Sequence, residues 1–158
     1  MARLIEVETL DQWQVVFDGI ADQFAAIDYT DPLNETLPKL EKAHQEFFDN
    51  EAGPTGAWPA LAPSTVRRKG HGIVLLESGK LTQSLGGRSA DSIREVFRDG
   101  ANNQHALIFG TSVEYSIFHQ QGTKRIPARP HVGITEPLLD QTAGEVADWT
   151  VAGLEDKA

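Results

Sequence analysis

The chain contains no cysteine, which excludes disulfides, thiol catalysis and cysteine-ligated zinc. It also has no apolar run near the roughly 18 residues that a membrane span needs. Residues 1–6 have no apolar signal core and soon reach an acidic side chain, so we expect no export signal. Hydrophobic residues make up 40% and charged residues 23% of the 158 positions, which is typical of a globular protein. This length fits a single domain, residues 1–158, with a real core.

Acidic and basic residues are distributed unevenly along the chain. Residues 1–57 carry 12 acidic and 3 basic side chains, residues 58–131 carry 5 and 10, and residues 132–158 carry 6 and 1. Acidic helices could cover and neutralise a basic sheet within one subunit, or acidic and basic faces could meet between subunits. Complementary charged faces between subunits determine the register and the encounter rate of association more than the affinity. The net charge of −9 disfavours nucleic acid as the main partner.

The N-terminal region, residues 1–50, is expected to be a helical hairpin. Apolar side chains recur there at spacings of three and four and form one helical stripe: Leu10, Trp13, Phe17, Ile20, Phe24 and Ile27. Thr9 and Gln12 form a capping box, so the first helix should begin near Leu10. Pro38 conflicts with an uninterrupted second helix. We therefore expect a short turn at 32–36 and a helix over 37–49, antiparallel to the first, with His44 packed at a core edge.

Residues 50–63 form a loop, because three prolines and two glycines exclude a regular element. Trp58 lies inside this loop. A large indole in a structureless segment must either bury itself or be held ready for a partner. We interpret Trp58 as an anchor that enters a neighbour's pocket.

The region 51–135 is expected to combine this loop with a small, mostly antiparallel sheet. Residues 93–97 and 105–109 are β-prone and flank a hairpin loop at 99–103. The second of these strands is apolar on both faces, which predicts a central, covered strand. Short helices are expected at 66–69, 80–85 and 114–120.

The chain then continues into an extended arm and a final helix. Residues 123–131 carry three basic side chains and two prolines, which favours an extended arm over a packed strand. Residues 136–158 form a C-terminal amphipathic helix that begins near Pro137. The predicted fold class is α+β, with the helical hairpin and the C-terminal helix packed on the sheet.

Catalytic patterns are absent from the sequence. The five histidines have no pair at helical ligand spacing, and no nucleophile elbow or phosphate-binding glycine loop occurs. We therefore predict no catalytic, cofactor-binding or metal-binding residues and no enzyme activity. The basic triplet Arg67-Arg68-Lys69 either stabilises a helix C-terminus or, together with Lys124, Arg125 and Arg129, binds phosphate or carboxylate groups.

Six short motifs follow one another between about residues 40 and 140. They are Trp58-Pro59-Ala60-Leu61, Ser64-Thr65-Val66-x-x-Lys69, Leu75-Leu76-x-Ser78-Gly79-Lys80-Leu81-x-x-Ser84-Leu85, Gly110-Thr111-x-x-x-Tyr115, His119-Gln120-x-Gly122-Thr123 and Ile126-Pro127-Ala128-Arg129-Pro130. Together they resemble the phage virion morphogenesis family, which includes tail-completion proteins of Mu-like and P2-like contractile-tailed phages. The chain has His131 where that family commonly has Phe, and Ser116 where it often has Ala.

The resemblance implies a non-enzymatic virion protein, made in the host bacterial cytoplasm, that acts at the head–tail junction without a cofactor. Its implied partners are further copies of itself in a hexameric ring, a tail tube or sheath protein, and the head–tail connector protein. Genomic DNA would pass nearby without specific binding, and no membrane is involved. The residues expected at partner interfaces are Trp58, Lys69, Tyr115, Lys124, Arg125, Arg129 and His131.

Two other functional classes stay open from the sequence. A nucleic-acid-binding accessory protein of DNA packaging would need the basic residues to form one continuous surface. A metal-dependent hydrolase would need histidine and carboxylate side chains to converge in the fold.

Overall fold

A computed structural model describes residues 10–100 and 104–155 of the chain. Within these stretches it is a mixed α+β structure, which confirms the predicted fold class. The helices are α1 (Leu10–Ala25), α2 (Thr30–Asp49), α3 (Pro63–Lys69), α4 (Lys80–Leu85), α5 (Ser116–Gln121) and α6 (Glu136–Glu155). The strands are β1 (Ala52–Gly53), β2 (Gly56–Ala57), β3 (Ser92–Asp99) and β4 (Gln104–Thr111). No helix in the described stretches is both long and apolar enough to cross a membrane.

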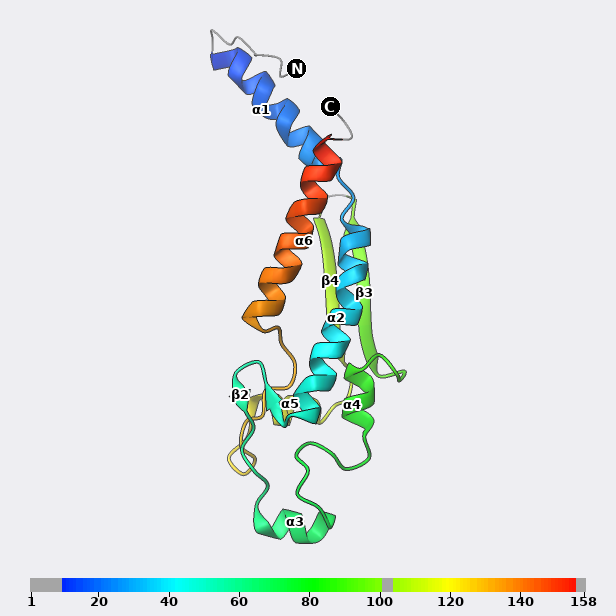
Figure 1. Cartoon of the computed structure of the whole chain (residues 1–158), viewed down its shortest axis with the longest axis vertical. Helices are drawn as coiled ribbons and strands as arrows, with labels where there is room; N and C mark the ends of the chain where they lie inside the picture. The colour runs from blue at the N-terminus through cyan, green and yellow to red at the C-terminus, as the bar shows by residue number, and fades with distance from the viewer. Residues whose placement is uncertain (1–9, 101–103, 156–158) are drawn as a thin grey trace.

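The molecule is elongated, and its elements are arranged along the long axis (Figure 1). The helix α1 and the end of α6 lie at one end, whereas α3 lies at the other. Between them α2 packs on the β3–β4 hairpin and against α6. The link from α1 to α2 is fixed on α6, where Trp149 Nε1 donates to the Asp28 carbonyl at 3.0 Å.

The antiparallel hairpin expected for residues 1–50 is not confirmed. Both predicted helices exist, but α1 lies beyond the start of α2 instead of alongside it (Figure 1). The stripe that suggested the hairpin is not uniformly buried, because Ile27 is 3% exposed whereas Phe17 and Phe24 are 57% and 45% exposed. The capping residue Thr9 lies outside the described residues.

The turn expected at 32–36 was wrong, because α2 runs without interruption from Thr30 through Pro38. Proline in a helix removes one amide donor and leaves the carbonyl four residues earlier unpaired. Here that carbonyl belongs to Asn34, and both Pro38 and Asn34 are exposed, so water can satisfy it. The opposite face of α2 is buried along its whole length, from Pro32 to Phe48. This continuous burial outweighs the local cost of the proline.

The β3–β4 hairpin forms as predicted, with antiparallel register from Ser92 opposite Thr111 to Asp99 opposite Gln104. Among the residues that the structure describes, this sheet has two strands, so the expectation that the second strand is central and covered was wrong. One face packs on α2. The other face is open, and Phe97 and Ile108 on it are each 44% exposed.

The hydrophobic core lies where the end of α2 meets the loops and α4. Its buried members are Phe47, Phe48, Trp58, Val74, Leu81, Leu85 and Val113. His44 is 1% exposed and packs beside this core, as expected. Its Nδ1 lies 2.7 Å from the Leu40 carbonyl oxygen, and its Nε2 accepts from the Gly133 amide at 3.3 Å.

The loop 50–63 contains more structure than its composition predicts. The two-residue strands β1 and β2 pair in antiparallel register around residues 54–55. The next helix, α3, is longer than the predicted 66–69 because Pro63 occupies its first turn, a position where a missing amide proton does no harm. Gly70 ends α3 in the left-handed region, with φ of 78°.

Candidate functional site

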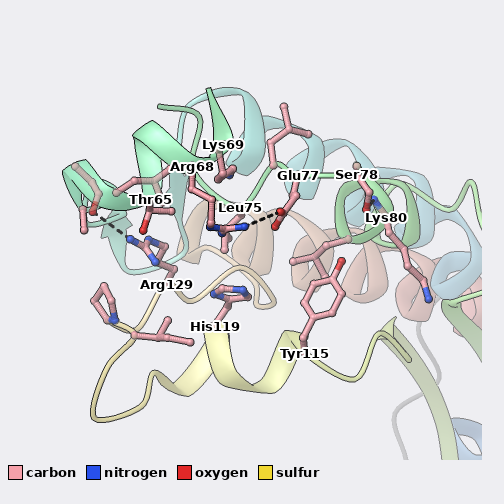
Figure 2. Close-up of a pocket in the computed structure, with 18 of the residues that line it drawn as sticks. Thr65, Arg68, Lys69, Leu75, Glu77, Ser78, Lys80, Tyr115, His119 and Arg129 are labelled. Carbon is pink, nitrogen blue, oxygen red and sulfur yellow. Dashed lines mark hydrogen bonds and ion pairs between the residues drawn. The ribbon is translucent and has the colours of Figure 1, made fainter. Parts of the chain in front are cut away.

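A groove with a volume of about 760 Å³ opens at the end of the molecule that carries α3 (Figure 2). Its walls come from α3, the 70–79 loop, α4, α5 and the segment 125–129. All six sequence motifs contribute to the lining, through residues that include Ala60, Thr65, Leu75, Tyr115, His119 and Ile126. Motifs spread over 70 positions of sequence therefore converge on one surface.

The groove is predominantly cationic. Five basic side chains line it and only one acidic side chain does, Glu77. The basic residues are Arg68, Lys69, Lys80, Arg125 and Arg129. Arg68 Nη1 pairs with Glu77 Oε1 at 3.2 Å, and Lys69 Nζ donates to the Ile73 carbonyl at 3.0 Å. These contacts leave a net positive charge at the groove.

Arg129 is a structural member of the groove wall. Its side chain is 4% exposed, and it donates from Nε to the Pro59 carbonyl at 2.8 Å and from Nη2 to the Ala60 carbonyl at 3.1 Å. Burial lowers the pKa of its guanidinium. Arg129 thus joins the segment 125–129 to the loop 59–62, and the two sides of the groove depend on it.

Trp58 and His131 are buried inside the subunit and do not line the groove. Trp58 is 7% exposed, and its Nε1 donates to the Pro130 carbonyl at 2.7 Å. His131 is fully buried, with Nε2 at 2.8 Å from the Ser116 hydroxyl and Nδ1 at 2.9 Å from the Arg129 carbonyl oxygen. Both side chains are satisfied within the fold. In this conformation neither side chain has the exposure to a partner that was expected from the sequence. Of the two alternatives for Trp58, burial in the fold or exposure for a partner, the structure shows burial.

His119 faces the groove beside Tyr115 (Figure 2). Burial lowers the pKa of His119, and the nearby charges of Arg129 and Lys69 lower it further, so a neutral imidazole is favoured. Its Nδ1 is buried and has no hydrogen-bond partner among the described residues. Tyr115 is 41% exposed, and its ring centroid lies 6.1 Å from that of His119. His119 was not predicted as a site residue from the sequence, although it belongs to one of the six family-like motifs.

The backbone at Leu75 is strained where it lines the groove. Leu75 has a φ of 54°, in the left-handed region that residues other than glycine rarely adopt. The turn is held in place by the preceding amide, because Val74 N donates to Glu51 Oε1 at 2.7 Å. Strain of this kind costs on the order of 1–3 kcal/mol and persists where the surroundings enforce it, often at functional sites.

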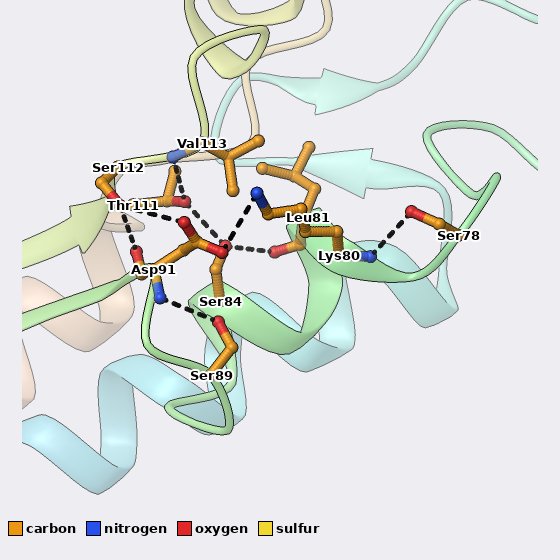
Figure 3. A network of polar contacts seen from close by, with 9 residues as sticks. All are labelled: Ser78, Lys80, Leu81, Ser84, Ser89, Asp91, Thr111, Ser112 and Val113. Carbon is orange, nitrogen blue, oxygen red and sulfur yellow. Dashed lines mark hydrogen bonds and ion pairs between the residues drawn. The ribbon is translucent and has the colours of Figure 1, made fainter.

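A polar network fixes α4, one wall of the groove, to the end of the β3–β4 hairpin (Figure 3). The hydroxyls of Ser84 and Thr111 lie 2.7 Å apart, and the Val113 amide donates to Thr111 Oγ1 at 3.1 Å. Lys80 Nζ pairs with Asp91 Oδ2 at 3.3 Å. The network therefore sets the position of Lys80 at the groove rim.

The structure brings together only part of the predicted interface set. Lys69, Tyr115, Arg125 and Arg129 line the groove. Lys124 is exposed on the segment 123–131 but does not line it. That segment has no regular structure, as expected, yet it folds back on α5, because Arg129 N donates to the His119 carbonyl at 2.6 Å.

The fold and the groove together define an elongated α+β protein with a cationic groove at one end. The sequence model of the phage virion morphogenesis family matches residues 8–150, and the chain belongs to that family. It is 34% identical over 113 residues to Mu-like prophage FluMu G protein 1 of Haemophilus influenzae, which covers 68% of this chain and 70% of the relative. Its role therefore lies in phage virion morphogenesis. No solved structure matches the chain significantly. In residues 10–100 and 104–155, no three His, Asp or Glu side chains are grouped to hold a metal ion.

Proposed function

We propose that the chain is a non-enzymatic structural subunit of the phage head–tail junction. It assembles into a ring and binds the tail tube or sheath protein and the head–tail connector protein. The observation that carries this proposal is the separation of charge between the two ends of an elongated subunit. The family supports a role in virion morphogenesis, and the position at the head–tail junction is part of the proposal.

The acidic end comprises α1 and the end of α6. Three acidic residues and no basic residue occur in α1, and the last two turns of α6 carry Asp148 and Glu155 and no basic residue. The cationic groove is lined in part by α3, which lies at the opposite end of the molecule (Figure 1). A contact between two unlike ends is heterologous, and repeated heterologous contacts generate a ring when the rotation between subunits closes.

Part of the charge is neutralised within the subunit. Glu41 on α2 pairs with Arg94 of β3 at 2.6 Å, and Asp28 pairs with Arg98 at 3.8 Å. This is the first arrangement considered from the sequence, acidic helices over a basic sheet. Lys124 and Arg125 are exposed and lie away from these helices, so the second arrangement, charge pairing between subunits, remains available to them.

The test reverses exposed charge at the basic end. Lys124→Glu combined with Arg125→Glu should prevent self-assembly and leave phage heads and tails unjoined in electron micrographs of lysates. Arg67→Glu is the matched control, because Arg67 is an exposed cation of α3 that lies neither on the segment 123–131 nor in the groove lining. Arg129 is excluded from the test because its loss would disrupt the groove wall. Normal particles from the double variant would contradict the proposal.

A DNA-packaging accessory role is the second candidate, and the groove cations other than the buried Arg129 favour it. If several groove cations contact phosphates, the logarithm of the DNA-binding constant should fall linearly with the logarithm of the salt concentration. DNA binding by the wild type with such a slope, lost in the Lys124→Glu and Arg125→Glu variant, would support this role over assembly.

A further inference from the structure

Arg129 brings an uncompensated positive charge to the groove. It is 4% exposed, and its side chain donates to the backbone carbonyls of Pro59 and Ala60. The ion pairs at the groove are formed by other cations, Arg68 and Lys80, and no carboxylate of the described residues pairs with Arg129. Burial of a charge is costly unless a counter-charge accompanies it. The groove therefore lacks an anion that its own subunit does not supply.

Other polar groups of the groove are also without partners. Arg125 lines the groove and Lys124 adjoins it in sequence, and both are exposed and form no ion pair within the described part of the chain. Nδ1 of His119 is buried without a hydrogen-bond partner there. Apolar side chains, Leu75 and Ile126 among them, line the same groove. A guest that carries carboxylates around an apolar centre would match both kinds of lining.

The C-terminal turns of α6 present such a surface. Spacings of three and four place four exposed side chains on one face of the helix, with a carboxylate at each end and two apolar groups between: Asp148, Val151, Ala152 and Glu155. Val151 is 55% exposed. The ion pair that α6 makes among the described residues joins Glu145 to Lys39, so the carboxylates of this face have no cationic partner there. The negative end of the helix dipole adds to their charge, and the last turn contains no basic residue.

We propose that this face of α6 in one copy occupies the groove of the next copy, a contact that rests on the self-assembly proposed above. Its carboxylates would supply the counter-charge that Arg129 and Arg125 lack, and Val151 would pack among the apolar side chains. Amphipathic helices bind grooves in this way, through apolar anchors on one face. The end of α6 lies at the opposite end of the molecule from α3, which lines the groove (Figure 1), so α6 cannot fill the groove of its own subunit.

A second open apolar surface exists, but its charge does not suit this face of α6. The open face of the β3–β4 hairpin carries Phe97 and Ile108 and continues toward α5. Glu95 lies opposite Ile108 on the same face, and Glu114 lines the adjoining hollow. These carboxylates would repel those of α6. The groove is therefore the better-matched receptor.

Exchange of charge across the proposed contact provides the first test. Asp148→Lys with Glu155→Lys reverses the α6 face, and Lys124→Glu with Arg125→Glu reverses the groove side. Each pair of changes should weaken self-association of the full-length chain about tenfold or more in analytical ultracentrifugation. The chain with all four changes should recover to within about threefold of the wild type, because the charges are again complementary.

The control for the α6 variant changes two exposed carboxylates outside the contact. Asp140→Lys with Glu95→Lys makes the same change in net charge, and it should leave self-association close to that of the wild type. Lysines near a helix C-terminus favour the helix, so the reversed α6 face should not unfold the chain. Circular dichroism checks that each variant is folded.

Disulfide cross-linking provides an independent readout, because the chain has no native cysteine. A full-length chain with both Val151→Cys and Ala62→Cys should form a ladder of linked multimers on non-reducing gels after oxidation. Ala62 is exposed and lines the groove. A chain with only one of these cysteines can link no further than a dimer. The control chain carries Val151→Cys and Ile108→Cys, on the open sheet face, and should also stop at dimers.

The outcomes separate this inference from the proposed function. If the wild type self-associates but the four changes together do not restore association, or the ladder forms through position 108 instead of position 62, the inference is wrong and the ring proposal stands. If the wild type neither self-associates in solution nor forms the groove ladder in joined particles, both the inference and ring formation are wrong.

Discussion

Replacement of Trp58 by phenylalanine distinguishes a core residue from an interface anchor. The indole Nε1 donates to the Pro130 carbonyl at 2.7 Å in a site where Trp58 is 7% exposed. Phe retains the aromatic contact with Phe48, whose ring centroid lies 5.5 Å away, but it leaves that carbonyl without its donor. A buried group that loses its hydrogen bond costs about 1–3 kcal/mol.

We therefore expect Trp58→Phe to lower the free energy of unfolding by about 1–3 kcal/mol. For a protein of this size, each kcal/mol corresponds to a decrease of about 2–4 °C in the melting temperature. Urea titration followed by far-ultraviolet circular dichroism measures the first quantity, and thermal melts measure the second. Once corrected for the fraction folded, self-assembly should equal that of the wild type.

Trp149→Phe is the matched control. Trp149 Nε1 also donates to a backbone carbonyl, that of Asp28 at 3.0 Å, but the residue is 38% exposed. Water can replace the lost donor there, so the loss should be about 1 kcal/mol or less. Equal losses for the two variants would refute the reasoning. Unchanged stability of Trp58→Phe with lost assembly would restore the anchor interpretation.

Further predictions concern stability. Gly53→Ala should lower the unfolding free energy by about 1–3 kcal/mol, because an added Cβ would overlap the Pro130 carbonyl. Gly19→Ala should raise it by up to about 1 kcal/mol, since nothing lies within 4 Å of that position in α1; urea titrations of both variants measure the contrast. Burial lowers the pKa of His44 and of His131, so below their ordinary value of about 6.5 the unfolded chain binds more protons. The unfolding free energy should therefore hold above about pH 7 and fall as the pH drops below about 6.5, as measured by melts across pH; a stability that rises on acidification would contradict this.

The sequence predicted elements whose signals are local. The strands β3 and β4 and the α6 helix follow from patterns within a few residues. The Pro38 error arose because a local rule was applied without knowing which face of α2 is exposed. The covering of β4 was equally unpredictable, since it depends on how many strands the sheet has.

The groove could be predicted only as a set of motifs. Its wall depends on Arg129 reaching the carbonyls of residues 59 and 60, 70 and 69 positions away, and no periodicity reports such a contact. Trp58 shows the same limit, because its partner carbonyl at Pro130 is 72 positions distant. The sequence left two alternatives for this indole, burial or exposure. Its hydrogen bond to the distant Pro130 carbonyl, which no local pattern predicts, accompanies burial.

Because the bonds of Arg129 assemble the groove from distant segments, the unfolded chain has no groove to offer. Any molecule that occupies it is then bound by the folded subunit alone, and its binding free energy adds to the stability of the fold. At 100 times its dissociation constant, such a guest contributes about 2.7 kcal/mol. Occupancy of the groove can thus be read as a rise in melting temperature, without labelling the guest.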